Sequence, residues 1–131
     1  MKVFNINGKE SDWIPKAGSN RKRSSFHTSA KNLLSKRFPT AQILDEVPFK
    51  PLSGKTLYLD LYITPHNIAI EVQGQQHYKF NSHFHKTIFD FHQQQSNDQI
   101  KKIWCNKNGI ELITLSCYET PEDWIGKFNE C

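Results

Sequence analysis

Alternating apolar and polar side chains mark the middle of this chain. Residues 57–63 and 68–73 are rich in aliphatic and aromatic side chains, and Thr-Pro-His-Asn at 64–67 is a turn signal. Two such runs joined by so short a turn predict a pair of antiparallel strands. Side chains alternate along a strand, so the first strand has two expected faces. One face holds Tyr58, Asp60 and Tyr62, and the other holds Leu57, Leu59, Leu61 and Ile63.

Helical spacing appears on both sides of this hairpin. Apolar residues at 26, 30, 33 and 34 predict a helix from Ser24 or Ser25 to about Arg37. A longer helix is expected over residues 87–108, ended by Asn108-Gly109. Its expected buried stripe is Ile88, Phe89, His92, Ser96, Ile100, Ile103 and Trp104. Pro121, at a first helical position, starts a third helix.

The remaining elements complete the predicted order. Residues 43–49 are expected to form a first strand, kept at an edge by Pro48, and residues 50–55 a loop. Residues 110–115 are expected to form a buried strand. The long helix would be a crossover that places the 68–73 and 110–115 strands in parallel. The predicted fold class is therefore α/β, with a mixed central sheet flanked by helices.

Length and cysteine content favour one small intracellular domain. The 131 residues suffice for a single domain, with residues 1–23 as a partly irregular basic arm and 24–131 as the domain. Three cysteines, at 105, 117 and 131, lack the paired spacing of a disulfide framework. No signal-peptide core or membrane-length apolar run is visible, so a cytoplasmic location is expected.

Positive charge is concentrated near the amino terminus. The formal net charge is +4, yet no Asp or Glu occurs from Trp13 to Leu44. The candidate nucleic-acid-binding residues of this segment are Arg21, Lys22, Arg23, Lys31, Lys36 and Arg37. A segregated basic segment suits a polyanionic partner such as DNA. A solvated arm is the alternative, and the two interpretations are compatible because such arms often order on nucleic acid.

Two carboxylates on the paired strands are the strongest chemical signal. Asp60 and Glu71 lie in apolar runs, where ionised groups are costly unless something compensates them. Either acid alone could face water, but together they predict a divalent cation, with Mg²⁺ suited to oxygen ligands. The carbonyl of Val72 could be a third ligand. Gln73 could orient a water, and His77 could transfer protons near neutral pH.

These residues resemble the core of the PD-(D/E)XK nuclease superfamily. Asp60 followed by Glu71-Val72-Gln73 matches its pattern, except that Gln73 stands where lysine is usual. The longer strings Glu71-Val72-Gln73-Gly74-Gln75-Gln76-His77 and Asp98-Gln99-Ile100-Lys101-Lys102 look like the very-short-patch-repair branch, which includes small phage and homing endonucleases. The similarity covers roughly residues 24–115 and implies a restriction-endonuclease-like core.

The resemblance implies roles for individual residues. Asp60 would be the central metal ligand, Glu71 and Gln73 would occupy the acidic and lysine positions, and His77 would match the branch's catalytic histidine. Asp98 would match the acid of the following helix. Glu46 is the candidate upstream acid, although members often place that acid in the preceding helix, where this chain has His27.

Several assignments have a structural alternative. Asp98 could form a surface ion pair with Lys101 or Lys102, and Lys102 could instead face phosphate from the side of the helix that carries Asp98. A structural Zn²⁺ site could combine His83 and His85 with Cys105 or Cys117, but the chain has no Cys-x-x-Cys, which disfavours zinc.

The sequence as a whole predicts a small Mg²⁺-dependent DNA endonuclease, with Mn²⁺ as a substitute, in a bacterial or phage-infected cell. A homodimer would be needed for concerted cleavage of both strands. A catalytically inactive nucleic-acid-binding module is one alternative, favoured by Gln73. A structure-specific or RNA nuclease is the other.

Overall fold

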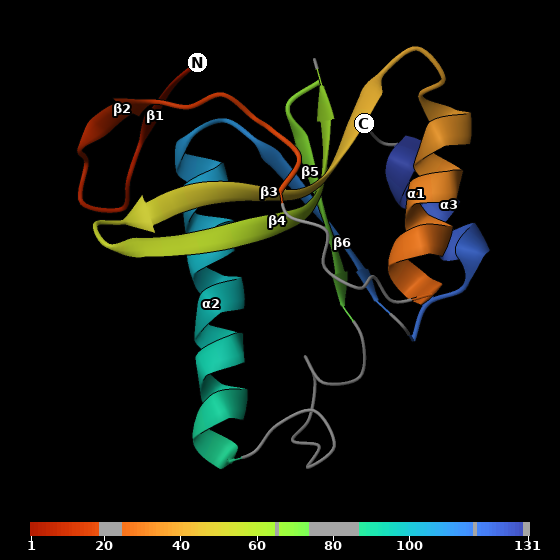
Figure 1. Ribbon diagram of the computed structural model, residues 1–131. Helices are drawn as coiled ribbons and strands as arrows, with labels where there is room; N and C mark the ends of the chain where they lie inside the picture. The colour runs from red at the N-terminus through yellow and green to blue at the C-terminus, as the bar shows by residue number, and fades with distance from the viewer. Residues whose placement is uncertain (19–24, 65, 74–86, 117, 130–131) are drawn as a thin grey trace.

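A four-stranded mixed sheet forms the centre of the protein (Figure 1). The computed structural model describes residues 1–18, 25–64, 66–73, 87–116 and 118–129. In the order β3-β4-β5-β6, the strands are Gln42–Leu52, Lys55–Thr64, Ile68–Gln73 and Glu111–Ser116. The pairs β3–β4 and β4–β5 are antiparallel, whereas β5–β6 is parallel. The predicted hairpin and the predicted parallel crossover are both confirmed.

Helices cover both faces of this sheet. Figure 1 shows α1 (Ser25–Arg37) and α3 (Pro121–Asn129) on one side and α2 (Ile88–Lys107) on the other. Two buried clusters follow the same division. One places Trp104 and Cys105 of α2 with Ala69, and the other places Leu34 of α1 with Ile70 and Trp124. The expected α/β class, a mixed sheet flanked by helices, is confirmed.

The crossover helix α2 begins and ends where its capping residues predict. Thr87 is the N-cap, and its hydroxyl accepts a hydrogen bond from the Asp90 N–H at 3.2 Å. The chain leaves the helix at Asn108 and Gly109, and Gly109 has a φ of 69° that favours glycine. Among the described residues no helix has both the length and the apolar character needed to cross a bilayer.

The predicted buried stripe of α2 is only partly correct. Trp104 is buried, but Ile88, Phe89 and Ile103 are 55%, 68% and 45% exposed, and Phe91 and Cys105 are buried instead. Figure 1 shows the amino-terminal part of α2 extending beyond the strands. Periodicity identifies an apolar side of a helix, but burial depends on which element lies opposite.

The first hairpin is longer than the sequence predicts. Residues 50–55, expected as a loop, instead continue β3 to Leu52 and start β4 at Lys55, so the turn is Ser53-Gly54. β3 accommodates Pro48 and Pro51 because it is an edge strand of the sheet, where missing ladder donors are tolerated.

The side chains of β4 change face at Asp60. Leu57 and Leu59 pack in the cluster that contains Trp104, whereas Leu61 and Ile63 pack in the cluster on the α1 side. The single face expected for these four residues is therefore wrong. The β3–β4 partners keep one register from Gln42–Thr64 to Phe49–Leu57, and Glu46, opposite Asp60, has a φ of 52°. Strict alternation fails here because the β3–β4 hairpin is bent (Figure 1), and the two halves of β4 contribute their leucines to different core clusters.

Residues 1–13 pack on the domain, unlike the irregular arm expected there. β1 (Lys2–Phe4) and β2 (Glu10–Asp12) pair antiparallel. The backbone N–H of Phe4 donates to Asn108 Oδ1 at 2.7 Å. Trp13 is buried, makes edge contacts with Tyr62 and Trp104, and donates its indole N–H to the Pro48 carbonyl at 3.0 Å. The boundary expected at residue 23 lies outside the described residues.

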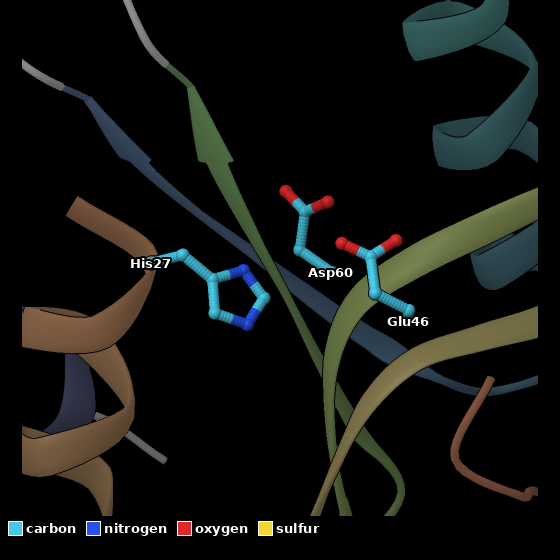
Figure 2. A group of neighbouring side chains, drawn as sticks. All are labelled: His27, Glu46 and Asp60. Atoms are coloured by element: carbon cyan, nitrogen blue, oxygen red, sulfur yellow. The ribbon is translucent and has the colours of Figure 1, made fainter. Parts of the chain in front are cut away.

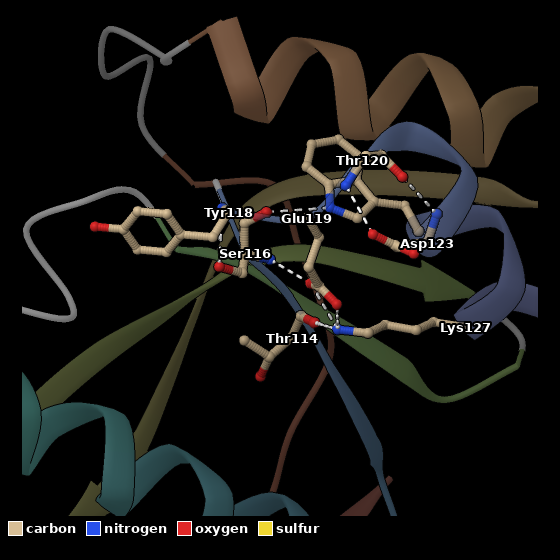
Figure 3. A network of polar contacts seen from close by, with 8 residues as sticks. Thr114, Ser116, Tyr118, Glu119, Thr120, Asp123 and Lys127 are labelled. Atoms are coloured by element: carbon tan, nitrogen blue, oxygen red, sulfur yellow. Dashed lines mark hydrogen bonds and ion pairs between the residues drawn. The ribbon is translucent and has the colours of Figure 1, made fainter.

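A polar network joins the end of β6 to α3 (Figure 3). The Thr120 N–H donates to Asp123 Oδ2 at 2.9 Å, and the Asp123 N–H donates to Thr120 Oγ1 at 3.2 Å, a reciprocal N-terminal cap. Lys127 donates to the Thr114 carbonyl at 2.6 Å and to Glu119 at 2.7 Å. These contacts hold α3 against the end of β6, on the side of the sheet opposite α2.

Candidate metal site

Asp60 and Glu71 lie side by side where β4 and β5 separate. The β4–β5 pairing ends at Leu61 and Ile70. Beyond this pair, the backbone N–H groups of the two strands donate to carboxylate side chains instead of to backbone carbonyls. The Val72 N–H donates to Asp60 Oδ2 at 2.8 Å, and the Asp60 N–H donates to Glu71 Oε2 at 2.9 Å. The two acids expected from the sequence are thus brought together in the gap between the strands.

The backbone of Val72 faces the same gap. In an extended strand the N–H and the carbonyl of one residue point toward the same neighbouring strand. Since the Val72 N–H reaches Asp60, its carbonyl is directed toward β4 as well. Asp60, Glu71 and the Val72 carbonyl therefore remain a consistent set of oxygen donors for a hard cation.

Lys101 is the residue of this site that sequence reasoning did not place. Its ammonium lies 2.5 Å from Glu71 Oε1, and both side chains are nearly buried, at 13% and 4% exposure. Gln73 is itself buried on β5, one strand position away from Val72. Lys101 precedes the buried Trp104 and Cys105 by three and four residues, so it lies on the same side of α2 as these core residues. That spacing could have indicated from the sequence that Lys101 faces the sheet.

A hollow of about 210 Å³ opens between β4 and α2 beside these groups. Asp60, Asp98 and Lys101 line it, which places Asp98 on the side of the helix that faces the site. Lys102 lines a different hollow, against β6, so its expected place on the same side as Asp98 is not supported. Lys101 follows Asp98 by three residues and Lys102 follows it by four. With about 3.6 residues per turn, the two lysines therefore lie on opposite flanks of Asp98.

A second group of donors meets Asp60 from the other direction (Figure 2). One ligand atom from each of His27, Glu46 and Asp60 lies within 4.8 Å of the others. Glu46, the candidate upstream acid, is therefore adjacent to Asp60. His27 extends from α1 toward both carboxylates, at the helical place where the resemblance puts an acid.

Contacts behind His27 hold its ring. Nε2 lies 2.9 Å from Asp45 Oδ1, and Asp45 Oδ2 lies 2.5 Å from the ammonium of Lys31. His27 and Asp45 are both buried. Lys31 is paired with the carboxylate that contacts His27, and its expected contact with nucleic acid stays a prediction.

The backbone beside Glu46 is tightly packed and bent. Its φ of 52° lies in the left-handed region, which is costly for a residue with a side chain. Gly18 donates its N–H to the Asp45 carbonyl at 2.9 Å, and a Cβ at Gly18 would lie 2.0 Å from the Glu46 carbonyl oxygen. Only glycine fits at position 18, where the chain approaches β3 and the bend at Glu46.

Burial controls the protonation of the site. Burial and then the neighbouring Asp60 raise the pKa of Glu71 to about 8. Burial also raises the pKa of Asp60, against the opposing effect of Lys101. Burial alone would lower the pKa of Lys101, but Glu71 and Asp60 outweigh it and raise that pKa. Below about pH 8, Glu71 therefore holds a proton that a divalent cation would displace.

Cys105 is a core residue. Burial and the nearby Glu71 raise the pKa of its thiol to about 12, so the thiolate form that zinc requires is disfavoured. The other members of the possible zinc set, His83, His85 and Cys117, lie outside the described residues.

We expect Mg²⁺ affinity to rise with pH up to about 8, because binding must release the proton held by Glu71. Calorimetry at neutral pH in two buffers of different ionisation enthalpy measures this proton release. Glu71→Gln should reduce it. A binding heat independent of the buffer would contradict the assignment.

The same shift predicts how the stability of the metal-free protein depends on pH. Glu71 loses its proton near 4.5 in the unfolded chain but near 8 in the folded protein. Folding therefore takes up a proton between these values, and the free energy of unfolding should fall as pH rises through them. Urea unfolding of wild type and Glu71→Gln at several pH values measures the difference.

The remaining predicted residues divide into two groups. Lys36 and Arg37 are exposed in the last turn of α1, where Arg37 lies over the Phe38 ring at 5.0 Å. His77 and the basic run Arg21, Lys22 and Arg23 lie outside the described residues. Their expected roles stay predictions.

Comparison with known proteins finds viral relatives. The chain is 42% identical over 67 residues to uncharacterized protein 307L of Invertebrate iridescent virus 6, covering 48% of this chain and 34% of that protein. It is 35% identical over 78 residues to uncharacterized protein 033L of Invertebrate iridescent virus 3, covering 60% and 40%. Uncharacterized protein 094L of Frog virus 3 is 42% identical over 66 residues, covering 50% and 43%.

The chain therefore matches less than half the length of these relatives, whose names assign no activity. No family model matches the chain, and no solved structure matches it. Any functional conclusion rests on the residues of this protein.

Proposed function

We propose that this protein is a metal-dependent nuclease that hydrolyses phosphodiester bonds in DNA. The observation that carries the proposal is the group formed by the buried Glu71 with the partly buried Asp60 and Lys101, beside a solvent-accessible hollow. Removing two carboxylates and an ammonium largely from water is costly in so small a domain, and apolar residues would fill the space at less cost. Retaining them fits a catalytic role better than a structural one.

The donor set fits a hard divalent cation. Asp60, Glu71 and the Val72 carbonyl would hold Mg²⁺ or Mn²⁺, whose charge polarises a phosphate and stabilises the leaving oxygen. Lys101 orients the Glu71 carboxylate through their direct contact and adds positive charge at the hollow. In this proposal Gln73 orients water through its amide, and His77 transfers the proton.

Lys101 also bears on the alternative of an inactive binding module. That alternative was favoured by Gln73, which cannot supply the positive charge of the lysine usual in the resembling family. The ammonium of Lys101 contacts Glu71 from α2 instead. A cation is thus present although the strand position lacks one, which favours the enzyme.

The basic residues suit a nucleic-acid substrate. Lys36 and Arg37, with the expected basic run before α1, would contact the phosphate backbone and supply affinity without sequence choice. DNA is the proposed substrate, and RNA or branched structures are competing substrates that share the chemistry. A homodimer and an intracellular bacterial or phage setting stay predictions.

Plasmid nicking is the direct test of the proposal. Supercoiled DNA should be cleaved with Mg²⁺ or Mn²⁺ and left intact with chelator. The ratio of nicked to linear product reports whether one strand or both are cut. Parallel reactions on single-stranded DNA, branched DNA and RNA identify the substrate class. Absence of cleavage of every substrate with either cation would contradict the proposal.

His77→Ala should lower the nicking rate about a hundredfold or more, the usual range for a positioned proton-transfer group. Thermal unfolding should change little. His92→Ala is the matched control, since His92 is exposed on α2. Equal rates for the two variants would remove His77 from the mechanism and leave the metal site as the tested part.

A further inference from the structure

We propose that His27, Glu46 and Asp60 form a second cation position, selective for a divalent transition metal over Mg²⁺. This proposal extends the proposed nuclease function, and the two are linked only by Asp60, which belongs to both sites. Donor atoms of the three residues lie within 4.8 Å of one another and come from α1, β3 and β4 (Figure 2). Three separate elements thus converge on one point, which local sequence does not explain.

An imidazole changes which metal the site prefers. Mg²⁺ favours carboxylates, carbonyls and water, whereas imidazole nitrogen suits transition metals such as Co²⁺ and Zn²⁺. His27 Nε2 contacts Asp45, and the other ring nitrogen, Nδ1, is turned toward Glu46 and Asp60 (Figure 2). One nitrogen and two carboxylates form a mixed donor set, unlike the oxygen set of Asp60, Glu71 and Val72.

The surroundings of His27 match those of metal-binding histidines. Such histidines usually contact a carboxylate through the second ring nitrogen, which fixes the tautomer and the orientation of the ring. Asp45 makes this contact at 2.9 Å and is itself paired with Lys31. The His27 side chain is only 6% exposed, so its ring is held in place before a cation arrives.

The position of Glu46 supplies an independent observation. Its left-handed backbone conformation lies within the edge strand β3, and Gly18 is packed against its carbonyl. Unfavourable backbone conformations persist where the surrounding structure imposes them, and they cluster at functional sites. Here the bend coincides with the point where β4 changes face and Asp60 meets both donor groups.

Cobalt binding to the whole protein tests this proposal without reference to cleavage. Co²⁺ should give visible absorption bands typical of mixed nitrogen and oxygen coordination, and should raise the Tm more than Mg²⁺ does at equal concentration. In His27→Ala, the Co²⁺ concentration that half-saturates the absorption bands should rise by about tenfold to a hundredfold. In Asp45→Asn, the same concentration should rise by about tenfold. His66→Ala, at an exposed histidine, is the matched control.

Glu46→Gln gives a second route if the His27 variant folds poorly, since it keeps the size of the side chain while weakening a ligand. Loss of the cobalt bands in Glu46→Gln, with the metal-free Tm unchanged, supports the site. Cobalt spectra unchanged in both variants, or equal Tm shifts from Co²⁺ and Mg²⁺, would overturn it. Glu71→Gln should retain the bands. A protein that binds Co²⁺ through His27 yet cleaves nothing would refute the nuclease proposal while keeping this one.

Discussion

Asp60→Asn should lower the nicking rate about a hundredfold to a thousandfold, the cost of removing several kcal/mol of charge stabilisation from a metal site. Asp60 is the residue common to both donor groups, so no other single change removes as much. The asparagine oxygen can still accept the Val72 N–H, which keeps the strands in place. The measurement is the initial rate of plasmid nicking at saturating Mg²⁺.

DNA binding separates this effect from a general loss of function. The variant lacks one negative charge near the phosphate, so its affinity for DNA in chelator should equal or exceed that of wild type. Asp12→Asn, at an exposed acid on β2, should leave both rate and affinity unchanged. Wild-type nicking by Asp60→Asn would reject the metal assignment.

Lys101→Met should destabilise the protein by about 3 to 5 kcal/mol above pH 8, the range found when one partner of a buried ion pair is removed. The ammonium of Lys101 is the compensating charge next to the nearly fully buried Glu71. Without it, Glu71 must either hold a proton or remain ionised without its partner. The penalty should therefore grow as pH rises through the pKa of Glu71, near 8.

Urea unfolding at several pH values measures this penalty. Lys102→Met is the matched control, because its exposed side chain lies on the other flank of α2, and it should change stability by less than about 0.5 kcal/mol. The double variant Lys101→Met, Glu71→Gln should recover part of the loss, since neither position of the pair then carries a charge. Equal effects of the two lysine variants, or no recovery in the double variant, would show that the pair is not coupled. Loss of nicking by Lys101→Met under conditions in which that variant remains folded would assign Lys101 to the chemistry.

The elements predictable from sequence are those whose signals are local. The turn at residues 64–67 joins β4 to β5, and Thr87 and Gly109 bound α2 because caps act within one helical turn. The proximity of Asp60 and Glu71 was predictable for the same reason, since a short hairpin leaves paired strands few possible registers. The α/β class followed from the order of these elements.

Some expectations failed because they required knowledge of opposing surfaces. The four aliphatic residues of β4 divide between two cores, since the hairpin bends at Glu46 and Asp60. Ile88 and Phe89 fit a helical stripe but are exposed, because that part of α2 extends beyond the strands. Trp13 belongs to the core although its neighbours in sequence have little periodicity.

By itself, the sequence determined the hairpin, the crossover and the pair of carboxylates, because hydrogen bonding and side-chain alternation act between close neighbours in the chain. Only the tertiary structure decided which charges meet that pair. Lys101 is 30 residues from Glu71, and His27 reaches Asp60 from a separate helix, α1. Contacts over such separations depend on how helices pack across the sheet, and no local pattern encodes that arrangement.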